Sequence, residues 1–346
     1  MAALAPLARA ALAAAALVGA IAPWPAAAQE SHLLLVVGLG GDPAYEETFH
    51  AWATTLRAAA LDTHRVPAEN VVYLGEGHAD HPGVIQARAT KENLGSALAA
   101  LSARAGERDR ILVVLIGHGT SREGEVSFNL PGPDVTAGDL DVMLRSFPTQ
   151  TVAVVNTSPS SGPFVQALSG PGRMILTATK TALERNATQF GQFFVEAFSG
   201  DGSDLDKDGR ISLLEAFEYT RREVERYYQE NNLLLTEHAL LDDNGDGQGS
   251  TEPGVDAADG RLARTFWLGT TAAADGAVAA DIPEGVTDPE LLRLYRERAV
   301  IEGRIEELRL LKDRMEEARY ERELEDLLVE LALKNREIRA RGGPGS

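Results

Sequence analysis

Five short segments between residues 33 and 178 are apolar at almost every position, and stretches with helical periodicity separate most of them. They are rich in Val, Ile and Leu and comprise residues 33–37, 71–74, 111–116, 152–155 and 174–178. A segment without a polar side is typical of a strand that is buried on both faces of a sheet. Such strands alternating with helices predict an α/β domain with a mainly parallel sheet and helices on both faces. The candidate site then lies in the loops at the carboxyl ends of the strands.

Residues 1–28 have the pattern of a secretory signal peptide. Arg9 precedes an apolar stretch over residues 10–22, and the small residues 26–28 precede Gln29. The apolar stretch is shorter than the roughly 20 residues that cross a bilayer, so we expect cleavage before Gln29 rather than an uncleaved anchor. No later stretch is apolar enough to predict a membrane span. We therefore expect an exported protein, either periplasmic or secreted.

The absence of cysteine and the negative net charge exclude several kinds of site and argue against several kinds of partner. The 346 residues contain no cysteine and carry a formal net charge of −19. The missing thiols exclude disulfide bonds, thiolate metal sites and a cysteine nucleophile. The negative charge argues against nucleic acid and anionic lipid as partners, because both carry the same sign. An acidic exported protein suits divalent cations instead.

Residues 204–215 match the loop of an EF-hand, which binds calcium. Calcium takes about six to eight oxygen ligands, and the carboxylates at loop positions 1, 3 and 5 converge because Gly209 at position 6 permits a sharp turn. Position 7 contributes a backbone carbonyl, position 9 a hydroxyl or a water, and position 12 a bidentate carboxylate. The predicted ligands, in this order, are Asp204, Asp206, Asp208, Arg210, Ser212 and Glu215. An acidic surface turn without a metal is the alternative.

A second acidic segment, residues 242–253, repeats only the start of this motif. Its predicted ligands are Asp242, Asn244, Asp246 and Gln248. Pro253 stands where the motif has its last carboxylate, so the set is incomplete. Glu252 or Asp256 can supply the missing oxygen. Calcium binding and a metal-free loop of Asx turns both stay open here.

Two polar loops follow the third and fourth apolar segments. The first is Gly-His-Gly-Thr at 117–120, and the second is Asn-Thr-Ser-Pro-Ser-Ser-Gly at 156–162. In these loops the chain resembles the caspase-like fold, specifically the legumain-type (C13-like) cysteine peptidases, in which His-Gly ends one strand and Asp/Glu-Ala-Cys-x-Ser-Gly ends the next. The resemblance extends over residues 31–270 and implies a caspase-like sheet. It also implies that His118 is the general base and that Gly119 supplies an oxyanion-hole amide.

The nucleophile departs from the family pattern. Aligned on the Ser-Gly pair, the cysteine position falls on Pro159, which has neither a nucleophile nor an N–H group. Aligned on the end of the strand, it falls on Ser158, and Ser160 follows two residues later. A serine hydroxyl needs much stronger activation than a thiol that ionises near neutral pH. A relative without activity and a hydrolase that uses His118 with Ser158 or Ser160 are the two interpretations.

The last part of the chain has a different pattern. Residues 270–287 are rich in Ala, Gly, Asp and Pro, which is typical of a linker after an α/β domain over residues 29–269. Residues 288–340 are dense in Glu, Arg and Leu, with apolar residues at coiled-coil spacing. They predict a helical hairpin that turns near residues 313–317, or one long helix, and offer a surface for self-association. We expect a disordered tail over residues 341–346.

Three functions are consistent with these features. The first is an exported calcium-binding protein whose peptidase-like domain is not catalytic and acts in scaffolding or in binding a peptide or protein ligand. The second is an active peptidase. The third is a structural protein that assembles through its C-terminal helices. The geometry of His118 and the serine hydroxyls decides between the first two.

Overall fold

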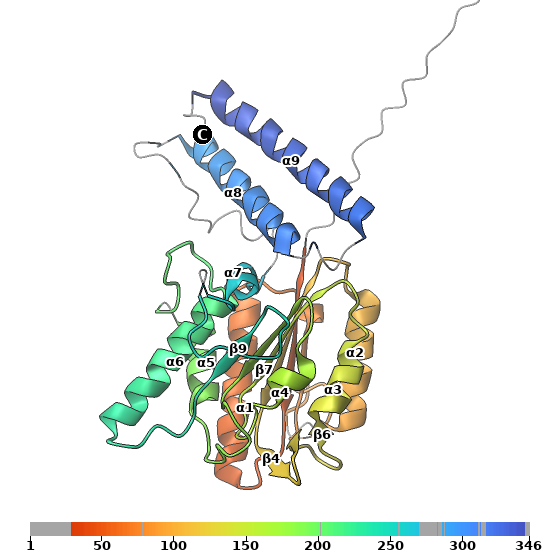
Figure 1. Ribbon diagram of the computed structural model, residues 1–346, viewed down its shortest axis with the longest axis vertical. Coiled ribbons are helices and arrows are strands. Elements are labelled where there is room, and N and C mark those ends of the chain that lie inside the picture. The colour runs from red at the N-terminus through yellow and green to blue at the C-terminus, as the bar shows by residue number, and fades with distance from the viewer. Residues whose placement is uncertain are drawn as a thin grey trace, which may run out of the picture.

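A six-stranded sheet forms the centre of the structure, a computed structural model (Figure 1). Its strands are β1 Ser31–Val37, β2 Val71–Leu74, β3 Arg110–Ile116, β7 Thr151–Asn156, β8 Arg173–Thr177 and β9 Leu240–Asp242. They lie in the spatial order β2-β1-β3-β7-β8-β9, and every neighbouring pair is parallel except β8 with β9 among the strands described. The expected α/β class with a mostly parallel sheet is thereby confirmed.

The structure describes most of the chain after the predicted signal peptide. The described residues are 29–77, 79, 81–200, 202–254, 257–269, 282, 286, 288–310, 312 and 316–342. The predicted signal peptide at 1–28, most of the predicted linker at 270–287 and the end of the predicted tail at 343–346 lie outside the described residues.

Helices cover both faces of the sheet. On one face lie α1 Pro43–Ala58, α5 Phe190–Ser199 and α6 Leu213–Glu230, and on the other lie α2 Lys91–Arg104, α3 Ala137–Leu144 and α4 Phe164–Leu168. Alternate residues of β1 belong to the two cores: Leu33 and Leu35 join the first, and Leu34 and Val36 join the second. Because successive side chains of a strand point to opposite faces, a strand between two cores must be apolar throughout.

A small antiparallel sheet follows β3. It consists of β4 Gly119–Arg122, β5 Glu125–Phe128 and β6 Val135–Thr136. The turn between β4 and β5 contains Glu123 and Gly124, whose φ angles of 52° and 88° suit a two-residue type I′ turn. The loop that contains His118 thus lies between β3 of the central sheet and β4 of the small one. The remaining short elements are a π-helical segment Ala59–Thr63, a 3-10 turn Ala68–Asn70 and α7 Arg261–Thr265.

Two long helices, α8 Pro289–Leu310 and α9 Glu317–Ala340, pack side by side beyond α7 (Figure 1). They share a buried apolar strip that consists of Ile301, Ile305, Leu308 and Leu327. Two ion pairs, Arg304–Glu330 and Lys334–Glu297, also join them. Arg319 of α9 pairs with Glu107, which precedes β3, so this helical pair lies at the amino-terminal edge of the parallel strands. Among the described residues, no helix combines the length and the apolar character needed to cross a membrane.

Candidate functional site

The first acidic loop turns its aspartates toward one point. Carboxylate oxygens of Asp204, Asp206 and Asp208 lie within 4.8 Å of one another. The N–H of Gly209 donates to Asp204 Oδ2 at 3.0 Å, and the N–H of Asp208 donates to Asp204 Oδ1 at 3.1 Å. Gly209 has a φ of 78°, which a residue without a Cβ adopts at no steric cost. The loop therefore wraps its backbone around the carboxylate of Asp204.

The first residues of α6 close this loop from its other end. Ser212 is the N-cap of α6, and its hydroxyl accepts the N–H of Glu215 at 3.2 Å. Glu215 Oε2 accepts the N–H of Ser212 at 2.9 Å, which completes a capping box. Glu215 Oε1 accepts the N–H of Leu205 at 2.9 Å, at the second position of the loop. The side chain of Glu215 thus reaches across to the aspartates, where a last ligand is required.

The carboxylates of this loop carry like charges and repel one another. Burial raises the pKa of Asp208 to about 6, and the negative charges of Asp206 and Glu215 act in the same direction. A hydrogen bond from the N–H of Arg210, at 2.8 Å, opposes this change. The Arg210 side chain lies over the ring of Trp267, with its guanidinium carbon 4.4 Å from the ring centroid. A divalent cation between the carboxylates would relieve their repulsion.

The second acidic loop repeats the backbone geometry of the first. The N–H of Gly247 donates to Asp242 Oδ2 at 3.0 Å, as the N–H of Gly209 does to Asp204. The N–H groups of Asp246 and Gln248 donate to Asn244 and Asp246 at 2.8 and 2.7 Å, which repeats the bonds that follow Asp206 and Asp208 in the first loop. Gly247 has a φ of 74°. The backbone of this segment therefore turns around Asp242, Asn244 and Asp246 as the first loop turns around Asp204, Asp206 and Asp208.

Asp259 closes the second loop, and the sequence did not predict this. Its Oδ1 accepts the N–H of Asp243, at the second loop position, as Glu215 accepts the N–H of Leu205 in the first loop. Asp259 is buried, and burial raises its pKa to about 6, with the negative charge of Asp242 adding to the increase. Glu252 is exposed, and Asp256 lies outside the described residues. The loop motif gave no signal for Asp259, because this residue lies well beyond position 253.

Both acidic loops lie at the amino-terminal edge of the parallel strands. The ring of Trp267 lies between the side chains of Arg210 and of Arg110, the first residue of β3. The second loop follows β9, which runs antiparallel, and its Gly245 packs against Gly170 before β8. The loop that contains His118 lies at the opposite, carboxyl-terminal edge, after β3. The two candidate sites are therefore separate.

His118 is held against the first helix of the domain. Its Nε2 lies 3.1 Å from the carbonyl oxygen of Gly40, and its ring makes T-shaped contacts with the rings of Tyr45 and Phe49. A carbonyl oxygen can only accept, so Nε2 carries a hydrogen atom. Burial lowers the pKa of His118, although the bond to Gly40 opposes the change. The imidazole is therefore neutral near pH 7, and Nδ1 keeps its lone pair.

The two candidate nucleophiles make hydrogen bonds elsewhere. Ser158 Oγ donates to Asn156 Oδ1 at 2.7 Å, and Ser160 Oγ donates to the carbonyl of Ala182 at 3.1 Å. All these side chains belong to the described part of the chain, and no hydrogen bond joins either serine to His118. The structure brings the loops of His118 and Ser158 together but does not form a pair of base and nucleophile.

Gly119 explains how closely these loops approach. A Cβ atom at Gly119 would lie 2.4 Å from the carbonyl oxygen of Pro159 and 2.6 Å from Ser158 Oγ. The resemblance assigns Gly119 to an oxyanion hole, which needs room for a substrate oxygen beside its amide. Ser158 and Pro159 fill the space against this glycine, so the arrangement favours packing between the loops over catalysis.

A cavity of about 250 Å³ opens beside the carboxyl end of β8. Phe190 and Ala239 contribute apolar surface to it, and Lys180 and Glu237 are among its charged lining residues. Burial raises the pKa of Glu237 to about 7, although N–H groups of Gln189 and Phe190 favour the ionised form. The cavity is smaller than the roughly 300–1,000 Å³ of small-molecule pockets and suits one side chain of a larger ligand.

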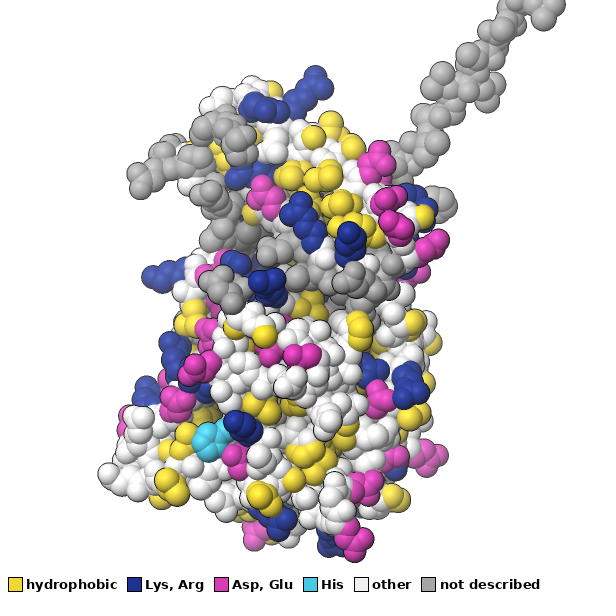
Figure 2. Space-filling view, viewed as in Figure 1, with side chains coloured by type: hydrophobic (Ala, Val, Ile, Leu, Met, Phe, Trp, Pro, Cys, Tyr) yellow, Lys and Arg dark blue, Asp and Glu magenta, His cyan; other side chains and the backbone are white. Residues whose placement is uncertain are grey.

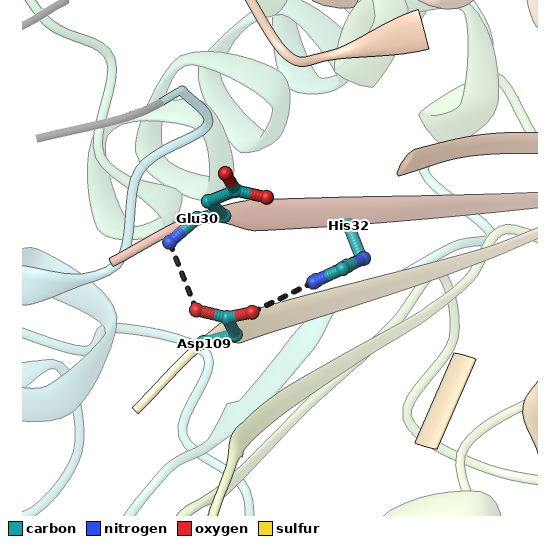
Figure 3. Close-up of side chains that lie close together, drawn as sticks. All are labelled: Glu30, His32 and Asp109. Atoms are coloured by element: carbon teal, nitrogen blue, oxygen red, sulfur yellow. Dashed lines mark hydrogen bonds and ion pairs between the residues drawn. The ribbon is translucent and has the colours of Figure 1, made fainter. Parts of the chain in front are cut away.

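A third polar cluster, Glu30, His32 and Asp109, joins β1 to the loop before β3 (Figure 3). His32 Nε2 lies 2.9 Å from Asp109 Oδ2, and the N–H of Glu30 donates to Asp109 Oδ1 at 2.9 Å. Burial acts to raise the pKa of Asp109, but bonds from His32 and from the N–H groups of Glu30 and Gly106 outweigh it and lower the pKa. Because both oxygens of Asp109 already accept hydrogen bonds, the cluster is explained as internal support.

A comparison with protein-family models and a comparison with curated protein sequences each found no match. The functional assignment therefore depends on the residues and geometry of this chain.

Proposed function

We propose that the protein is an exported calcium-binding protein, with one ion held in loop 204–215 and a second in the loop that begins at Asp242. The observation that carries this proposal is the position of Glu215, which reaches from α6 to the aspartates at the start of its loop. Calcium is bound by aspartates at positions 1, 3 and 5 and a glutamate at position 12 around a glycine turn. The ligands are all oxygen atoms, which favours a hard cation over zinc or copper.

A structural role for calcium fits these loops better than a sensor role. The first loop is anchored to the sheet through Trp267, and the second loop is tied to α7 through Asp243, whose carboxylate accepts the N–H groups of Gly260 and Ala263. Calcium bound to both loops would neutralise their carboxylates. It would thereby stabilise the contact of the first loop with Trp267 and that of the second loop with α7, at one edge of the sheet. The predicted signal peptide supports delivery to a compartment where calcium is abundant.

Isothermal titration of the chelator-treated protein with calcium tests this proposal. We expect two ions per chain, and we expect Glu215→Gln and Asp259→Asn each to remove one of them. The matched control is Glu252→Gln, which changes an exposed acid beside the second loop and should leave both ions bound. Absence of calcium binding, or loss of both ions in the control, would contradict the assignment.

The α/β domain, in this proposal, is caspase-like and does not catalyse peptide cleavage. Support for the resemblance comes from the adjacency of β3 and β7, which places the His-Gly loop and the serine loop at the same edge of the sheet. Support for the lack of catalysis comes from Ser158 Oγ, whose hydrogen atom is donated to Asn156. A general base accelerates attack when it lies within hydrogen-bond reach of the nucleophile, directly or through one water molecule. The cavity beside β8 would then receive a side chain of a bound peptide or protein.

A peptide library incubated with the calcium-loaded protein tests the catalytic part of the proposal. We expect no cleavage by the wild-type chain, because His118 and the serine hydroxyls have separate partners. The variants His118→Ala, Ser158→Ala and Ser160→Ala serve as controls for contaminating peptidases. Cleavage that persists through purification and disappears in His118→Ala and in one serine variant would show an active hydrolase and identify its nucleophile.

A further inference from the structure

The outward side of α9 carries a cluster of apolar side chains, Leu328, Val329, Ala332 and Leu333. Leu328, Val329 and Leu333 are 44%, 53% and 55% exposed among the described residues. The opposite side of the same helix buries Leu327 and Ile338. The outward cluster therefore takes no part in the contact between the described residues of α9 and α8.

This cluster forms a shallow apolar surface at the edge of the molecule. Figure 1 shows most of α9 lying away from the central sheet, and Figure 2 shows hydrophobic side chains gathered along the helical pair. An open groove of about 380 Å³ runs along it, between Glu321 at one end and Ala332 at the other. Exposed apolar residues gathered on one side of a helix mark a candidate surface for association.

The two ends of this surface carry opposite charges. Within residues 321–327, just before the apolar cluster, the exposed residues are Glu321, Arg322, Glu325 and Asp326, which sum to a negative charge. Exposed residues after it are Arg336, Glu337, Arg339 and Arg341, which sum to a positive charge. Glu325 and Arg336 stand on nearly the same line of the helix, about 16 Å apart along its axis. The surface is therefore complementary to itself, but only when two copies run in opposite directions.

We propose that α9 pairs with α9 of a second copy of this chain, antiparallel and about a two-fold axis between residues 330 and 331. This axis places Leu328 opposite Leu333 of the second copy and Val329 opposite its Ala332. It also places Glu325 opposite Arg336 of the second copy, and symmetry repeats each contact. A parallel pair would instead bring acid to acid and base to base. The single-helix contact is small, so the dimer dissociates readily.

Complementary ends matter for this chain because its net charge opposes association. Two copies with a formal charge of −19 each repel one another at a distance. Local pairing of Glu325 with Arg336 sets the register and offsets this repulsion, while the apolar cluster supplies the contact. The proposal does not involve the calcium loops, so it stands or falls separately from the proposed function.

Sedimentation velocity of the purified chain, in calcium and in EDTA, tests the proposal over about 1 to 300 µM, where small interfaces dissociate. We expect a concentration-dependent dimer in both buffers. Leu328→Asp should weaken it at least tenfold, whereas Val142→Asp should not, because Val142 is equally apolar and 64% exposed on α3. Both variants change exposed residues, and circular dichroism checks that they fold.

A charge exchange tests the antiparallel register. Glu325→Arg places arginine opposite Arg336 of the second copy, and Arg336→Glu places glutamate opposite Glu325, so each should weaken the dimer several-fold. The double variant restores opposite charges at both contacts and should recover wild-type association. A chain that stays monomeric at the highest concentration, a dimer unaffected by Leu328→Asp, or a double variant no better than the singles would overturn the proposal.

Discussion

Calcium is expected to raise the free energy of unfolding by about 4 kcal/mol at roughly 10 mM free ion, for a site half-saturated near 10 µM. The physical reason is that only the folded chain brings Asp204, Asp206, Asp208 and Glu215 together. In the folded loop burial raises the pKa of Asp208, and repulsion from the carboxylates of Asp206 and Glu215 acts in the same direction. An ion that binds the folded chain and not the unfolded chain shifts the equilibrium by mass action.

Urea unfolding in EDTA and then in calcium measures this effect. Glu215→Gln should lose the part of the gain that comes from loop 204–215, because it removes one of the charged ligands while its amide oxygen can still accept the N–H of Ser212. Magnesium at the same concentration should stabilise much less, since it demands a smaller octahedral shell. Equal unfolding curves in EDTA and calcium, or equal stabilisation by magnesium, would count against a dedicated calcium site.

Gly119→Ala is expected to lower the free energy of unfolding by about 3 kcal/mol. The added methyl group would overlap the carbonyl oxygen of Pro159 and the hydroxyl of Ser158, at 2.4 and 2.6 Å. The oxygen of Pro159 belongs to the backbone and cannot move without displacing the whole serine loop. The variant should therefore separate the two loops or strain both of them.

The control for this change is Gly95→Ala in α2. The nearest atom to a Cβ at Gly95 is the methyl carbon of Met143 at 3.6 Å, an ordinary contact. Alanine in a helix interior is more stable than glycine by roughly 0.5 to 1 kcal/mol, so this variant should gain stability. If Gly119→Ala proved as stable as Gly95→Ala, the loops of His118 and Ser158 would not be in the contact described above.

The central sheet could be predicted from sequence because each of its parallel strands is buried on both faces. Residues 111–116 show this most clearly, since no other structure accommodates a run of six such residues between polar loops as readily. The strands β4 and β5 gave no comparable signal, because they are short and half-exposed and carry Thr120, Arg122 and Glu125. β9 was missed as well, since its three residues adjoin an acidic loop.

The residues of the candidate sites could be predicted where they lie close together in the sequence, and they were missed where the fold brings them from distant segments. The first acidic loop could be predicted because its ligands lie within twelve consecutive positions, 204–215. Asp259 could not, since the fold brings it to Asp243 from a separate segment. The question of catalysis depended on side-chain partners that no motif specifies: Gly40 for His118 and Asn156 for Ser158.

Diffraction from crystals grown in calcium, with anomalous differences measured, tests the central claim most directly. We predict an anomalous peak with oxygen atoms of Asp204, Asp206, Asp208 and Glu215 at roughly 2.3 to 2.6 Å from it. We predict a second peak bounded by Asp242, Asp246 and Asp259. Absence of a peak in the first loop, with Glu215 still hydrogen-bonded only to Leu205, Asp206 and Ser212, would contradict the proposed function.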